Sequence, residues 1–205
     1  MEHKKDCAEW PGVIRFEFSF EKLRDVLTYF AQRVDDLDSL KAAKLIYLAD
    51  RLHLHKYGRP ITGDRYVHLE HGPVPTLSLD YIRDLIDPKN RAFVPKGKLE
   101  LLRERIAVEE ATPYPRLKAM GVWEIEYLSE SDVEILDQVI AEYGDLSSWA
   151  CRELTHDHST WLDTNEHEDI DFRLFFKDAP EEANAGFEFM LATQEDRDFI
   201  SYLNA

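Results

Sequence analysis

The sequence has few cysteines and no long apolar run. Its two cysteines, Cys7 and Cys151, lie far apart and form no CxxC pair, so neither a disulfide framework nor a dithiol redox site is expected. No apolar segment approaches the roughly 20 residues that a membrane-spanning helix requires. The charged residues 1–6 are not followed by the apolar stretch of a signal peptide. These absences favour the reducing cytoplasm as the compartment.

Motifs that mark common enzyme classes are also missing. The chain has eight glycines, and none of them forms the GxGxxG or GxxxxGK pattern that cradles a phosphate. It contains no HExxH pair for a catalytic zinc ion. We therefore expect a protein that needs no cofactor or metal and is not an enzyme.

Basic residues are scarce relative to acidic ones. Lys and Arg number 25, whereas Asp and Glu number 41, which gives a net charge of −16. Because phosphate backbones are bound by Lys and Arg, nucleic acid is disfavoured as a partner, and anionic membranes are disfavoured for the same reason. A basic protein is favoured, since complementary charge accelerates encounter. The alternative, that the charge only maintains solubility, stays open.

What the chain does contain is a globular composition with strong helical periodicity. Its 205 residues, 44% of them hydrophobic, are enough for one domain with its own core. Apolar residues recur at helical spacing over residues 20–34, after a capping Ser19. Residues 40–57 are apolar around most of the helix circumference, which predicts a central, buried helix that ends at Gly58 and Pro60.

The remaining segments give shorter elements. A turn and short strand are expected over 61–69, a stiff connector over 71–75, and a helix from a capping Thr76 to Ile86. Ser129 predicts a capped helix that stops at Gly144, and a short helix is expected over 146–154. Strands are expected over 91–94 and 123–128, whereas 98–110 fits either helix or strand. We predict an α+β fold, a mainly α-helical bundle with a small antiparallel β-sheet.

Three regions divide the chain. Residues 1–19 are expected to be a weakly ordered leader and residues 20–168 the domain. Residues 169–205 are expected to form a helical extension rich in aromatic residues. So many aromatic side chains imply docking, either onto the domain itself or onto a partner.

The segment from Lys41 to Pro75 carries a distinctive pattern. It reads KAAKLIYLADRLHLHKYGRPITGDRYVHLEHGPVP and combines a buried helix, the run YGRPITGD, a short strand and the run GPV. Further pieces follow in order: Leu128-Ser129, Tyr143-Gly144, Leu154-Thr155-His156 and Trp161. Over roughly residues 20–165, the sequence resembles the Panacea domain, the family of SocA-like antitoxins of bacterial and phage toxin–antitoxin systems.

The resemblance implies a function in protein binding. Members of this family are antitoxins that bind and neutralise varied toxins, so it implies direct binding of a cognate toxin, with a prophage as one setting. Many such toxins act on RNA, which again favours a basic partner. The first alternative is an adaptor that delivers a partner to an ATP-dependent protease. A metal- or cysteine-dependent enzyme and a prophage protein without a toxin are further alternatives, and a homo-oligomer is also compatible with the sequence.

The motif residues divide into expected scaffold and expected contacts. Gly58 permits a left-handed helix stop, Pro60 fixes the exit of the chain, and Arg59 is placed to pair with Asp64 or Asp50. The expected scaffold is the set Tyr47, Asp50, Tyr57, Gly58, Pro60, Gly63, Gly72, Pro73, His156 and Trp161. The expected partner contacts are polar residues around the turn and the connector, namely Arg51, His55, Arg59, Asp64, Tyr66 and His71. Aromatic residues such as Trp149 are further candidates for a binding surface.

The enzyme alternative rests on a few residues near the end of the domain. His156 and His158 form the best histidine cluster, but four convergent zinc ligands are not evident. We interpret His156 as a buried ring that ties two loops together and His158 as a solvated side chain. Cys151 fits a small core residue better than a nucleophile, because no orienting third group accompanies it.

Overall fold

The structure, a computed structural model, describes residues 14–87, 89 and 94–203, with side chains described as far as Arg197. These residues form eight α-helices and two antiparallel two-stranded sheets, which confirms the expected α+β, mainly helical class. None of the described helices is both long and apolar enough to cross a bilayer. The elements are α1 (Phe20–Ala31), α2 (Ser39–Tyr57), β1 (Tyr66–Leu69), β2 (Gly72–Pro75), α3 (Thr76–Ile86), α4 (Lys96–Arg103), β3 (Ile106–Glu109), β4 (Arg116–Ala119), α5 (Glu130–Tyr143), α6 (Ser148–His156), α7 (Ser159–Leu162), the 3-10 helices η2 (Phe172–Phe176) and η3 (Glu181–Ala183), and α8 (Asn184–Leu203).

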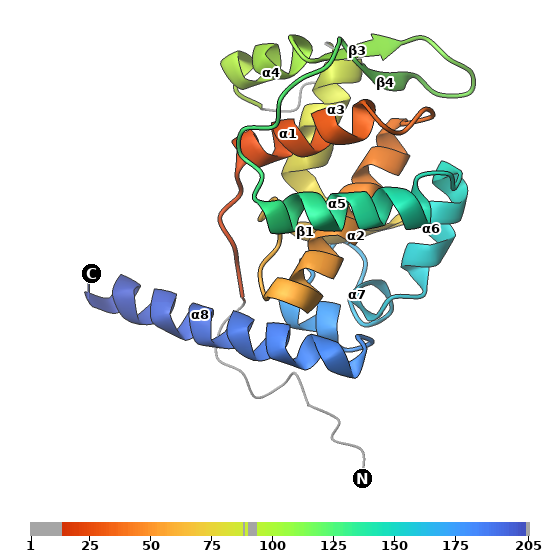
Figure 1. Ribbon diagram of the computed structural model, residues 1–205. Helices are drawn as coiled ribbons and strands as arrows, with labels where there is room; N and C mark the ends of the chain where they lie inside the picture. The colour runs from red at the N-terminus through yellow and green to blue at the C-terminus, as the bar shows by residue number, and fades with distance from the viewer. Residues whose placement is uncertain (1–13, 88, 90–93, 204–205) are drawn as a thin grey trace.

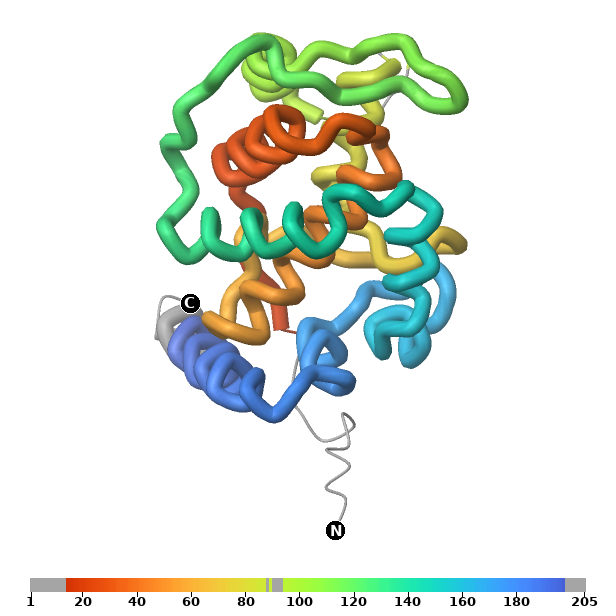
Figure 2. Tube along the Cα trace, turned by 45° about the vertical axis from the view of Figure 1, so that its right-hand side comes forward, coloured from red at the N-terminus to blue at the C-terminus, as the bar shows by residue number. Residues whose placement is uncertain are grey.

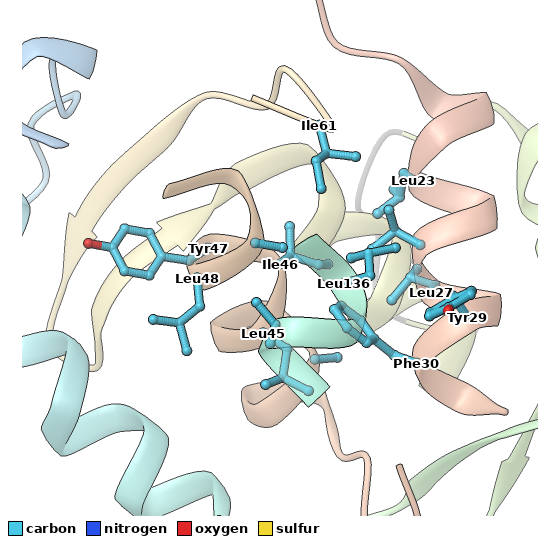
Figure 3. Packing of buried hydrophobic residues seen from close by; sticks show 14 of the residues in the cluster. Leu23, Leu27, Tyr29, Phe30, Leu45, Ile46, Tyr47, Leu48, Ile61 and Leu136 are labelled. Carbon is cyan, nitrogen blue, oxygen red and sulfur yellow. The ribbon is translucent and has the colours of Figure 1, made fainter. Parts of the chain in front are cut away.

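Helix α2 runs through the centre of the molecule, as its apolar circumference predicts. Helices α5, α6 and α8 and strand β2 pack around it (Figure 1). Figure 3 shows Ile46 of α2 among the side chains Leu27 and Phe30 of α1 and Leu136 of α5. The helix ends at Gly58, whose φ of 67° is the left-handed conformation that glycine adopts without strain.

Residues 72–75 of the expected connector form strand β2, so the prediction of an irregular connector over 71–75 was wrong. β1 and β2 form a hairpin in which Val67 pairs with Val74 and His68 with Pro73. The backbone groups of His68 and Tyr66 bond on the other side of β1, to Glu168, His167 and Ile170. The proline of β2 opposite His68 therefore stands where the ladder needs no N–H, which makes a strand compatible with proline.

The second sheet settles the segment 98–110, which contains both structures. Helix α4 comes first, and β3 then pairs with β4, with Val108 opposite Leu117. The strand expected over 123–128 is absent, because the N–H groups of Glu126 and Tyr127 donate to the Asp25 carboxylate at 2.8 Å instead of to a neighbouring strand. Most of the strand expected over 91–94 lies outside the described residues.

Helix caps follow the sequence in two cases and depart from it in one. Ser19 caps α1, and Ser129 forms a capping box with Asp132 at the start of α5. Thr76 does not cap α3, because it is the first residue of that helix and its hydroxyl donates to the carbonyl of Arg65.

The segment after residue 166 packs on the domain rather than standing apart. Its residues 167–170 pair with β1, and the apolar side chains Ile170, Phe172, Phe175, Phe187 and Met190 are buried. Helix α8 packs against α2 at the end of the molecule opposite the β3–β4 hairpin (Figure 2). Residues 14–19 of the expected leader also lie against the domain, since Ile14 is buried and Phe16 contacts Phe172 edge to face.

Candidate functional site

Asp50 holds the YGRPITGD turn against the central helix. Its buried carboxylate accepts hydrogen bonds from the backbone N–H groups of Ile61 and Thr62 at 2.8 and 2.9 Å, and from the hydroxyl of Tyr66 at 2.8 Å. Burial raises the pKa of Asp50, and the bonds from Thr62 and Tyr66 oppose that rise. The carboxylate acts as a structural acceptor that replaces the missing backbone partners of the turn.

Asp64 performs a related task at the start of α3. Its carboxylate accepts from the N–H groups of Leu77 at 3.1 Å and Ser78 at 2.7 Å, which are unpaired at the first turn of the helix. Gly63 has a φ of 69°, and a Cβ there would lie 2.1 Å from the carbonyl oxygen of Glu17. The turn therefore packs on one side against the segment that contains Glu17, which precedes α1, and on the other side against α3.

Arg59 pairs with Asp132 of α5, so the prediction of a pair with Asp64 or Asp50 was wrong. Both of those carboxylates are occupied by backbone donors. The Asp132 carboxylate lies 3.0 Å from both Arg59 Nη2 and His53 Nε2, and 2.8 Å from Lys22 Nζ. Burial alone would raise the pKa of Asp132, but the hydrogen bonds from His53 and Lys22 hold it well below its usual range.

Three of the six expected contact residues are buried. His55 binds the carbonyl of Phe175 through Nε2 at 2.6 Å, while Asp64 and Tyr66 are fully enclosed. The prediction that these three side chains lie at the surface was wrong, because each polar group finds its partner inside the protein. Polarity at a motif position did not imply exposure.

The other three expected contacts do not form one cluster. Arg51 donates to Asp178 at 2.8 Å near η2, Arg59 faces α5, and His71 stands exposed at the tip of the β1–β2 hairpin. Their role in binding a partner stays a prediction. Of the expected scaffold residues, seven are buried, namely Tyr47, Asp50, Gly58, Pro60, Gly63, Gly72 and Pro73, and three are half-buried, namely Tyr57, His156 and Trp161.

Aromatic, histidine and arginine side chains surround the hairpin tip. We call His71, Trp149, Arg152, His156 and Trp161 the hairpin-tip patch. Arg152 donates to His71 Nδ1 at 3.4 Å, and its guanidinium lies 4.9 Å from the centre of the Trp149 ring. The rings of His156 and Trp161 stack with centroids 4.1 Å apart. Side chains from the β1–β2 turn, α6 and α7 thus meet on one surface.

The hairpin tip sits directly on the central helix below this patch. Gly72 has a φ of 89°, and a Cβ there would lie 2.8 Å from Lys44 Nζ and 2.8 Å from His156 Cδ2. The buried Lys44 donates to the carbonyl of Pro73 at 2.9 Å. Burial lowers the pKa of Lys44 to about 7, and the nearby Arg152 acts in the same direction. The motif glycine is required here by close packing as well as by backbone conformation.

Comparison with known proteins identifies the domain. The family model described as the antitoxin SocA-like, Panacea domain matches residues 43–162. The chain belongs to the Panacea domain family. No curated protein and no solved structure matches it. The matched region begins within α2 and ends with α7. Both the YGRPITGD turn and the hairpin-tip patch therefore lie inside the Panacea domain.

His158 of the Panacea domain is half-buried and bonded within the protein, so its interpretation as a solvated residue was wrong. Its Nδ1 lies 2.9 Å from the hydroxyl of Tyr47, and burial lowers its pKa to about 4. His156 is also half-buried, and its ring stacks on that of Trp161. Helical periodicity could not show which of the two histidines bonds inside the protein, because α6 ends between them.

Cys151 offers little support for the enzyme alternative. Its side chain is fully buried on the inner face of α6, and burial raises the pKa of the thiol, which disfavours the reactive thiolate. Among the described residues, no group of three or more His, Cys, Asp or Glu side chains is arranged to hold a metal ion.

The outward face of α6, with its aromatic and basic side chains, was not recognised from the sequence. Trp149, Arg152 and His156 recur at spacings of three and four, which places them on one helix face, while Cys151 and Thr155 face inward. That spacing was available in the sequence. What the sequence did not reveal is that the hairpin tip, some 80 residues earlier in the chain, lies against this face.

Proposed function

We propose that the chain is an antitoxin that neutralises a cognate toxin by binding it directly, without catalysing a reaction. The observation that carries the proposal is the match of the SocA-like Panacea domain over residues 43–162. The geometry supports it in a second way. The carboxylates of the motif, Asp50 and Asp64, are committed to backbone donors and are not aimed at a substrate.

The charge of the chain indicates the class of toxin. A net charge of −16 favours a basic partner, because complementary fields increase the association rate. Binding would take place in the cytoplasm, where a toxin that acts on RNA or translation would meet its target. The toxin would be held in a stoichiometric complex that shields its active surface.

Co-expression tests this proposal. The reading frame next to the one for this chain is expressed alone and together with it, and growth is recorded while the amount of tagged toxin is measured. We expect growth arrest without the chain, full rescue with it, and unchanged toxin abundance in the rescued cells. Size-exclusion chromatography of the purified pair should give one complex of fixed stoichiometry.

Two results would change the assignment. Rescue that requires a functional ATP-dependent protease and removes the toxin would favour an adaptor over occlusion. A neighbouring product that is harmless when expressed alone would contradict the antitoxin function.

A further inference from the structure

Two large apolar side chains are exposed on the helices that carry the hairpin-tip patch. Trp149 at the start of α6 is 61% exposed, and Leu162 at the end of α7 is 62% exposed. Trp and Arg dominate the energetics of protein interfaces, and here Trp149 stands next to Arg152 on the same face of α6. Other exposed hydrophobic residues include Met120 and Val122 on the irregular chain after β4, and the aromatic residues Tyr114, Tyr127 and Phe189 elsewhere in the described chain.

The patch is held rigid before any partner arrives. Arg152 pairs with Glu153, donates to the carbonyl of Glu70 at 3.3 Å and lies over the Trp149 ring. On the other side, the indole N–H of Trp161 donates to the carbonyl of Leu69 at 3.3 Å. A surface whose side chains are already ordered loses little conformational entropy on binding.

Acidic side chains border the patch. Glu70 at the hairpin tip, Glu153 on α6 and Asp157 after α6 are all exposed. Arg152, the basic residue among them, is largely occupied by Glu153 and the hairpin. The surface therefore has an aromatic centre with a negative rim, which is complementary to an apolar site surrounded by Lys and Arg.

We propose that the hairpin-tip patch, together with Leu162, is the surface on which the toxin docks, and that the toxin presents an apolar site rimmed by basic residues. This inference rests on the proposed antitoxin function. Trp149 is the central anchor, and the carboxylates of Glu70, Glu153 and Asp157 steer the basic partner to it.

Trp149→Ala tests the anchor, and Tyr114→Ala is its matched control. Tyr114 is an aromatic residue of the loop between β3 and β4 and is 60% exposed, almost the same as Trp149. The probe is the neighbouring gene product that the growth assay has shown to be toxic and rescued by the wild-type chain. By isothermal titration calorimetry, Trp149→Ala should weaken binding by about 30-fold or more, and Tyr114→Ala by less than about threefold.

Glu153→Gln tests the steering role of the rim. The association rate measured by stopped flow should fall by about two- to fivefold at low salt, and its dependence on ionic strength should become shallower, because exposed charges act on encounter and are screened by salt. Thermal unfolding of each variant, followed by circular dichroism, checks that the fold is retained. Leu162→Ser supplies a second apolar variant should Trp149→Ala fold poorly.

The outcomes separate the inference from the function on which it rests. If the wild-type chain binds the toxin and Trp149→Ala and Leu162→Ser bind it equally well, the docking surface is wrong while the antitoxin function stands. If these variants instead dissociate a dimer of the chain in analytical ultracentrifugation without weakening toxin binding, the patch is a self-interface and the inference is overturned. If the wild-type chain binds no toxin, both proposals fail.

Discussion

Buried aspartates hold several turns and helix starts of this fold in place. Asp50 and Asp64 bind the N–H groups of turns and helix starts. Asp132 joins the side chains of Lys22, His53 and Arg59, and Asp25 binds the backbone of residues 126 and 127. Each is fully buried in a chain of high negative charge. A sequence cannot distinguish such an acid from a surface acid, because the distinction depends on donors that arrive from distant segments.

Asp50→Asn should destabilise the protein although it changes the side chain very little in size. The amide has one oxygen instead of two, and its NH2 group would face N–H or O–H donors of Ile61, Thr62 and Tyr66. We expect the free energy of unfolding to fall by about 2–4 kcal/mol, measured by urea denaturation at pH 7.

The control for this substitution is Asp35→Asn, since Asp35 is exposed in the turn between α1 and α2. It should change the free energy of unfolding by less than about 0.5 kcal/mol. Equal stability of the two variants would show that the Asp50 carboxylate does not hold the turn.

At the scale of elements, local signals predicted the helices well and the strands less well. Helices α1 and α5 begin after the capping residues Ser19 and Ser129, and α2 ends at Gly58. Each of these residues acts within one helical turn of the boundary, so the sequence alone is enough to place the three helices. β2 could not be predicted in this way, because a strand that contains Pro73 is possible only where its partner needs no N–H there. The hairpin-tip patch was missed for the same reason, since it depends on contact between distant segments.

The crossing of α2 and α8 depends on a glycine. A Cβ on Gly186 would lie 2.4 Å from the carbonyl oxygen of His55 and 2.5 Å from that of Leu54, both backbone atoms of α2. Gly186→Ala should therefore lower the free energy of unfolding by about 1–3 kcal/mol, because the two helices must separate. The expected loss occurs even though alanine is the better helix former.

Gly97→Ala is the matched control, because Gly97 also lies in a helix, α4, and a Cβ there meets no atom within 4 Å. It should leave stability unchanged or raise it by up to about 1 kcal/mol. Chemical denaturation of both variants in parallel separates close packing from helix propensity. A stabilised Gly186→Ala variant would contradict the tight crossing of α2 and α8.

At the scale of the whole molecule, the folded unit is larger than the family match. The match ends at residue 162, yet residues 167–170 supply the outer edge of β1, and Phe175 packs between Tyr47 and Tyr66 of the matched region. An exposed strand edge and an uncovered aromatic cluster would both favour aggregation. The C-terminal segment therefore completes the core in this chain.

Phe175→Ala tests whether this segment belongs to the cooperative unit. The ring is fully buried, so its removal should lower the free energy of unfolding by about 3–5 kcal/mol. Phe189→Ala, at a more than half-exposed position of α8, is the control and should cost less than about 1 kcal/mol. A chain that stops after residue 166 should be poorly soluble and lack a cooperative thermal transition. If that shortened chain instead unfolds at the same temperature as the full chain, and Phe175→Ala is no worse than Phe189→Ala, residues 167–205 lie outside the unit that folds.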